Sequence, residues 1–182
     1  MANFDNAFKI ILKHEGGFQK MPGDKGNWTG GKVGAGVLKG TKYGISAAQF
    51  PDLDIENLTI EDAEAIYKKE YWFYDGVDYQ DIANKMADLG VLFGPAPVIA
   101  VMQTTLQSTD ESQPVTGTFG PVTQGHVNEV DQGSLMRMFT ANMVTHAFNV
   151  VTHNPGERQY LKGWVDRINC SDETPCDRCA GA

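Results

Sequence analysis

The stretch FDNAFKIILKHEGG, residues 4–17, predicts an amphipathic helix that ends at two glycines. Phe4, Phe8 and Ile11 recur at the spacing of one helical face. At about 100° per residue, Glu15 points in the same direction as Phe4. The sequence therefore puts a carboxylate on an apolar stripe, at the C-terminal end of its helix.

The position of Glu15 suits a general acid. Partial burial and the negative end of the helix dipole both favour the protonated form of a carboxyl group. A protonated Glu can donate to a glycosidic oxygen, and the two glycines that follow leave room for a substrate. Periodicity alone favours the alternative, in which Glu15 lies at the edge of the apolar face and reaches solvent.

The next part of the chain combines a long loop with shorter helical signals. Residues 19–42 are rich in Gly and Lys and predict a long loop or a small glycine-rich hairpin region. A loop of that length in a compact domain is usually functional. A short helix is expected from Ser46 to Pro51. Thr59 is expected to cap another helix, with Asp62 completing a weak capping box.

The second half reads as further helices with one interruption. An aromatic run at residues 71–74 is expected to join the two halves. The sequence shows no repeated strand signature, which argues against a parallel sheet. Helices are expected at residues 80–92 and after Pro95 or Pro97. A long helix is expected to follow, with a buried side formed by Leu135, Met136, Phe139, Met143 and Phe148. The last helix is expected around Tyr160, Leu161, Trp164 and Ile168.

Composition excludes several classes of protein. The 182 residues are 41% hydrophobic, enough for one compact domain or one domain with two lobes. A net charge of -8 argues against nucleic acid as a partner and gives no attraction to an anionic cell wall, so a shaped groove must supply recognition. No segment reaches the roughly 18–20 apolar residues of a membrane span. The N-terminus lacks the features of a signal peptide, and we expect a monomer that is not inserted in a membrane.

The cysteines and histidines give no strong sign of a cofactor. Cys170, Cys176 and Cys179 all lie at the end of the chain, whereas a disulfide-stapled fold would spread them out. The Cys176–Cys179 pair could bind a metal or form a redox pair, but a tail without chemistry is the favoured interpretation. The four histidines show no ligand spacing. We therefore expect neither a catalytic metal nor another cofactor.

Two motifs together resemble the signature of family 108 glycoside hydrolases. They are HEGGF at residues 14–18 and GTKYGIS at residues 40–46. The family comprises phage endolysins and related bacterial muramidases. GNWTGG at residues 26–31 is similar to its longer-loop members, as is the segment 58–72. The second half resembles the family's peptidoglycan-binding region, through VTGTFGP at residues 115–121 and GWVDR at residues 163–167.

The resemblance implies a mainly α, lysozyme-like fold in which a small irregular or β-hairpin lobe lines a groove. Residues 1–75 would form the catalytic lobe. Residues 76–169 would form a helical lobe that resembles a peptidoglycan-binding region and packs as one unit with the first, and residues 170–182 a Cys-containing tail. By the same resemblance, Glu15 is the general acid of an N-acetylmuramidase that cleaves between N-acetylmuramic acid and N-acetylglucosamine and causes bacterial lysis.

Glycoside hydrolysis usually needs a second carboxylate. Asp24 is our candidate, because it follows Glu15 by nine residues in a loop expected to line the groove. That spacing resembles phage lysozymes, which place a Thr slightly further on, so Thr41 is expected to hold a water. Asp24 could instead hold a turn. Tyr43 could contact a sugar or Glu15, or lie in the core. Trp28 could stack on a sugar, but we favour a role in packing its loop onto the body of the protein.

Two rival functions remain open. A lytic transglycosylase also needs one protonated Glu in a helical fold, but it needs no water-activating base and leaves an anhydro ring. A non-catalytic wall-binding module would keep the fold without activity. A phage endolysin would be made in the host bacterial cytoplasm without a signal peptide and act on the periplasmic wall. It would then need a separate holin-type pore for access.

Overall fold

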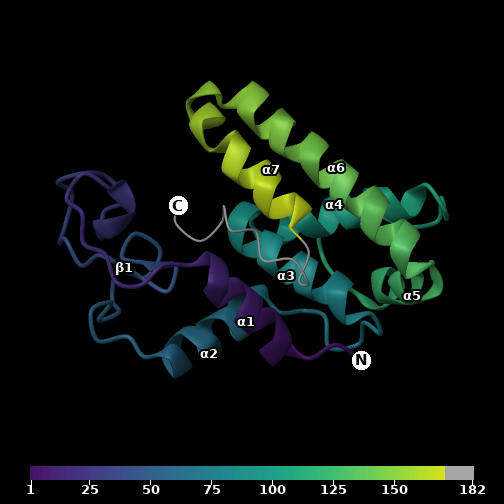
Figure 1. Cartoon of the computed structure of the whole chain (residues 1–182), viewed down its shortest axis with the longest axis horizontal. Coiled ribbons are helices and arrows are strands. Elements are labelled where there is room, and N and C mark those ends of the chain that lie inside the picture. Colours follow the sequence, from purple (N-terminus) through teal and green to yellow (C-terminus); the bar gives the residue numbers. More distant parts are fainter. Residues whose placement is uncertain (171–182) are drawn as a thin grey trace. The chain divides into compact units, whose positions relative to one another are not determined.

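The computed structural model describes residues 1–170 and shows helices with one small antiparallel sheet (Figure 1). This confirms the mainly α class expected from the sequence. In chain order the elements are α1 (Phe4–His14), η1 (Lys25–Asn27), β1 (Thr41–Lys42), β2 (Ile45–Ser46), α2 (Ile60–Tyr71), α3 (Gln80–Phe93), α4 (Pro95–Gln107), α5 (Pro121–Glu129), α6 (Gln132–His153), η2 (Pro155–Tyr160) and α7 (Leu161–Asn169).

The chain forms two compact units. Among the described residues, the helical unit comprises Met1–Ile11 together with residues 71–170, and the loop unit comprises Leu12–Glu70. The first eleven residues therefore group with the second half of the chain, whereas the scheme drawn from the sequence placed residues 1–75 together in a catalytic lobe. All five candidate site residues belong to the loop unit.

The helical unit is built on α4. This helix packs against α3 and α6, and α6 in turn packs against α7, as Figure 1 shows. Gly94, at a φ of 86°, lets the chain turn between α3 and α4, and Pro95 then opens α4, where a missing N–H costs nothing. The core consists of large side chains with almost no exposure, among them Met86, Leu89, Met102, Leu106, Leu135 and Phe139.

Both motifs that resemble a peptidoglycan-binding region make internal contacts. The half-buried Arg167 in α7 forms an ion pair with the buried Asp88 in α3, with 2.8 Å between Nη2 and Oδ1. The Gln103 side chain accepts hydrogen bonds from the backbone N–H groups of Thr116 and Gly117, at 2.8 and 2.9 Å. Since an unpaired buried charge or amide is costly, these contacts hold the helices and the turn of this unit in place.

Two expectations about local structure are wrong. The segment from Ser46 to Pro51 is not a helix, because Ser46 pairs with Thr41 in the sheet and only a single turn follows, too short to propagate a helix. Phe148, expected on the buried side of α6, is 52% exposed. The buried stripe of α6 runs through Phe139, Met143 and Ala147, and the next residue points about 100° away from it.

The start of α2 follows the predicted capping box. The Thr59 hydroxyl accepts a hydrogen bond from the backbone N–H of Asp62 at 3.1 Å, and the Asp62 carboxylate accepts one from the backbone N–H of Thr59 at 3.1 Å. Two backbone donors that a helix start leaves unpaired are thereby satisfied. This fixes the residue at which α2 begins, and hence the position of Tyr67 along α2 within the loop unit.

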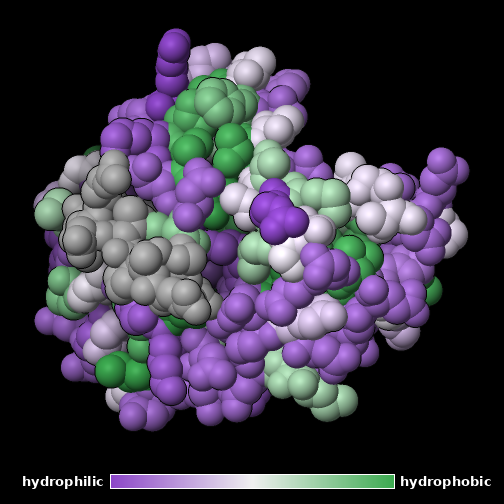
Figure 2. Space-filling view, turned by 45° about the vertical axis from the view of Figure 1, so that its right-hand side comes forward, coloured by the Kyte–Doolittle hydropathy of each residue, from purple (hydrophilic) through white to green (hydrophobic). Residues whose placement is uncertain are grey.

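The face of the molecule seen in Figure 2 is mainly polar. Figure 2 shows hydrophilic side chains over most of the visible face, with apolar side chains in separate groups. Within residues 1–170, no helix is long and apolar enough to cross a membrane. Of the three cysteines, Cys170 follows α7 directly, whereas Cys176 and Cys179 lie outside the described residues.

Candidate active site

The centre of the site is a tight hairpin. Strands β1 and β2 pair antiparallel, with Thr41 opposite Ser46, and Tyr43 and Gly44 form the two-residue turn between them. Both turn residues have positive φ, 51° and 75°, as a type I′ turn requires. Glycine adopts this conformation freely, whereas tyrosine is strained in it. A strained tyrosine persists only where its surroundings hold it, and two hydrogen bonds do so here.

These two hydrogen bonds tie Tyr43 to separate parts of the loop unit. Its backbone N–H donates to the carbonyl of Gly16 at 3.1 Å, which connects the hairpin to the Glu-Gly-Gly motif. Its carbonyl accepts a hydrogen bond of 2.8 Å from the hydroxyl of Tyr67, a buried residue of α2. The hairpin turn is thus fixed between the end of α1 and the side of α2.

Glu15 packs directly onto this turn. It follows the last residue of α1 and is half-buried. A Cβ atom added to Gly44 would lie 2.6 Å from Oε2 of Glu15 and would also collide with the Tyr67 hydroxyl. The carboxylate and the hydroxyl therefore crowd the same face of Gly44, and only glycine leaves them room. The two motifs that the sequence offered separately meet at this point.

Asp24 holds a turn in the adjacent loop. It caps η1, and its Oδ1 accepts a hydrogen bond from the backbone N–H of Gly26 at 2.8 Å. Its Oδ2 accepts from the side-chain amide of Gln19 at 3.0 Å. The residue is exposed, so one carboxylate combines a local capping contact with access to solvent.

Asp24 and Thr41 belong to one hydrogen-bond network. Its centre is Asn27, which is fully buried. Oδ1 of Asn27 accepts from the Thr41 hydroxyl at 2.7 Å and from the Gln19 amide at 3.0 Å. Gln19 also pairs with Thr41 through two backbone hydrogen bonds. The structure therefore connects Thr41 to Asp24 through Gln19 and Asn27.

Trp28 fastens the glycine-rich loop. The indole N–H donates to the carbonyl of Pro22 at 2.9 Å, and its backbone forms an isolated bridge with Leu38. The side chain is half-buried. Because its one polar atom is engaged within the loop, only the face of the ring could serve a ligand.

Sequence reasoning missed four residues of this arrangement. Tyr67 counted only as part of an apolar helical face, and Gly44 only as part of a motif. Gln19 carried no signal and Asn27 counted only as part of the motif GNWTGG, because nothing in a glycine-rich loop marks which amide is buried. Among the described residues, no group of three or more His, Cys, Asp or Glu side chains could hold a metal ion.

The fold is lysozyme-like, and in the loop unit Glu15, directly after α1, packs against the hairpin turn. Residues 8–94 match the family model described as Glycosyl hydrolase 108. The matched segment includes Glu15, the hairpin, α2 and α3. This match supports a peptidoglycan hydrolase.

A solved structure supports the same fold. The protein SagA of Brucella abortus aligns with a TM-score of 0.67 and 19% sequence identity. The alignment covers 91% of this chain and 88% of that one, so the similarity extends over both units. A search of curated proteins found no match. The lysozyme-like fold expected from the sequence is confirmed.

Proposed function

We propose that the protein is an N-acetylmuramidase that cleaves the bond between N-acetylmuramic acid and N-acetylglucosamine in peptidoglycan, with Glu15 as its general acid. The observation that carries this proposal is the packing of the Glu15 carboxylate onto Gly44. It joins the Glu-Gly-Gly motif to the Thr-Lys-Tyr-Gly motif inside the segment that matches the family. In this role Glu15 protonates the glycosidic oxygen as the bond breaks.

For the second group, we propose that Asp24 activates the attacking water and that Thr41 helps to orient it. Asp24 is exposed, and its hydrogen bonds from Gly26 and Gln19 hold its carboxylate in one orientation within the loop. The Thr41 hydroxyl donates a hydrogen bond to Oδ1 of Asn27. The lone pairs of the Thr41 oxygen can therefore accept a hydrogen bond from a water. Tyr43 and Trp28 would offer ring faces to the sugars.

The products test the bond and the reaction. We expect digestion of purified sacculi to release fragments with muramic acid at the reducing end, seen as hydrated ends by mass spectrometry. Fragments with an anhydro ring would instead identify a lytic transglycosylase. Binding to sacculi without release of any fragment would identify a wall-binding module.

Replacing Asp24 by Asn tests the second group. If Asp24 is the base, kcat should fall roughly 10²–10⁴-fold, because an amide cannot take a proton from water. The variant keeps an oxygen that can cap Gly26, so its thermal unfolding should change little. Steady-state rates on soluble glycan fragments measure kcat. If kcat fell by less than about tenfold, Asp24 would have only a structural role in its turn, and Thr41 alone would orient the attacking water.

For the biological role, we propose a phage-type endolysin. The support is the resemblance of the sequence motifs to a family that includes phage endolysins. The protein would be made in the host bacterial cytoplasm and reach the periplasmic wall through a separate holin-type pore, acting there as a monomer. Cells that make it without such a pore should stay intact until their membrane is permeabilised.

A further inference from the structure

Charge is distributed unevenly along the chain. The whole protein carries a net charge of -8. Residues 13–42, the basic segment, nevertheless hold six lysines against only Glu15 and Asp24, a net charge of +4. The rest of the chain therefore carries -12. The overall charge hides a positive region in the same stretch that contains the candidate catalytic residues.

Two of the six lysines serve the structure of the loop unit. Lys39 donates to the carbonyls of Pro51 and Leu53, at 2.6 and 3.2 Å. Lys42 donates to the carbonyl of Glu56 at 2.8 Å. Both lysines thus fasten the segment after the hairpin to the hairpin itself, and neither is free to bind a ligand without breaking these contacts.

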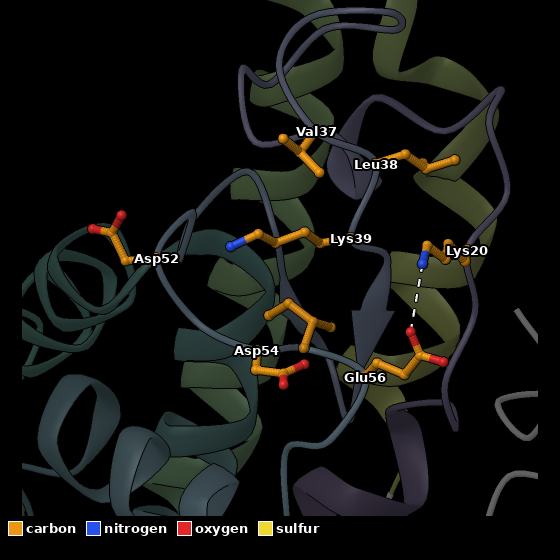
Figure 3. A pocket seen from close by; sticks show the side chains of 8 residues that line it. Lys20, Val37, Leu38, Lys39, Asp52, Asp54 and Glu56 are labelled. Atoms are coloured by element: carbon orange, nitrogen blue, oxygen red, sulfur yellow. Dashed lines mark hydrogen bonds and ion pairs between the residues drawn. The ribbon is translucent and has the colours of Figure 1, made fainter.

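The cavity beside them is a poor anion site. It has a volume of about 280 Å³ and is lined by Lys20 and Lys39, but also by Asp52, Asp54 and Glu56 (Figure 3). Hydrogen bonds from Asn57 hold the pKa of Asp54 below its usual range, so this carboxyl group is ionised at neutral pH. An anionic ligand would meet more negative than positive charge here.

The other four lysines are on the surface. Lys13, Lys20, Lys25 and Lys32 are all exposed. Lys20 lies 3.5 Å from Glu56, an exposed pair of the kind that contributes little. Within residues 1–170, neither Lys25 nor Lys32 forms an ion pair. These side chains can attract an anionic partner over about 10 Å at moderate ionic strength.

We propose that the exposed lysines of the basic segment bind the carboxylates of peptidoglycan peptide stems. The inference rests on the proposed function. The sugars of a glycan strand are neutral, whereas each stem peptide carries free carboxylates, so the charge of the substrate lies in its stems. A strand drawn to residues 13–42 arrives at Glu15, while the acidic remainder of the protein repels it. Wall recognition therefore has an electrostatic part that the net charge of -8 conceals.

The test measures binding apart from cleavage. In a Glu15→Gln background, Lys20, Lys25 and Lys32 are changed to Glu. Sedimentation with purified sacculi at low and at about 0.15 M salt should show roughly tenfold weaker binding at low salt and a much smaller salt dependence. The matched control changes Lys9, Lys69 and Lys162 to Glu, since these are exposed lysines outside the segment and the overall charge changes equally. The control should bind as the parent does.

Three outcomes would overturn the proposal. One is an equal loss of binding in both triple variants, which would make overall charge the cause. Another is unchanged salt dependence when an amidase has removed the stems from the sacculi. The third is tighter binding to vesicles of anionic lipid than to sacculi. None of them depends on the products of the reaction, so this inference and the proposed muramidase can fail separately.

Discussion

Replacing Glu15 by Gln is expected to lower kcat roughly 10²–10⁴-fold, because the amide has the size of the acid but cannot deliver a proton to the leaving oxygen. KM should change little, since the side chain still fills the space beside Gly44. Rates on soluble glycan fragments separate the two constants, and turbidity of permeabilised Gram-negative cells gives a second readout.

The matched control for this change is Glu61→Gln. Glu61 is an exposed residue of α2 in the same loop unit, so the charge change is equal while Glu15 is untouched. Its kcat should stay within about twofold of wild type, as for most surface substitutions. Undiminished lysis by the Glu15→Gln variant would remove Glu15 from the role of acid, whatever the control does.

Local signals in the sequence predicted where helices begin and end. The capping box at Thr59 and the glycines after Glu15 act over three or four residues, so a single sequence is enough to recognise them. Helical spacing also predicted that Glu15 points in the direction of Phe4, and in the structure Glu15 directly follows the last residue of α1. The error at Ser46 has the opposite origin, because its strand pairing with Thr41 depends on a turn that propensity alone does not reveal.

The contacts of the site could not be predicted in this way. Asn27 is fully buried, and its role depends on Gln19 and Thr41 reaching it from either side of the loop. Tyr67 sits on a face that periodicity marks as apolar, but its hydroxyl reaches the carbonyl of Tyr43. Such contacts arise from the path of the backbone between motifs, which a sequence pattern does not encode.

Replacing Gly44 by Ala tests whether the backbone of the hairpin turn positions Glu15. The alanine would be forced into a left-handed conformation, which costs about 1–2 kcal/mol of stability. Its methyl group would also push away the Glu15 carboxylate and the Tyr67 hydroxyl, both of which are ends of movable side chains. We expect kcat to fall about 100-fold, as for a catalytic group displaced by about 1 Å.

The control isolates the collision from the backbone strain. Gly34 has a φ of 80°, close to the 75° of Gly44, but a Cβ atom added there meets nothing within 4 Å. Gly34→Ala should therefore lower stability to thermal unfolding about as much and leave kcat nearly unchanged. Equal kcat in the two variants would mean that the hairpin turn does not position Glu15. A selective loss in Gly44→Ala would show that the space above this glycine holds the acid in place.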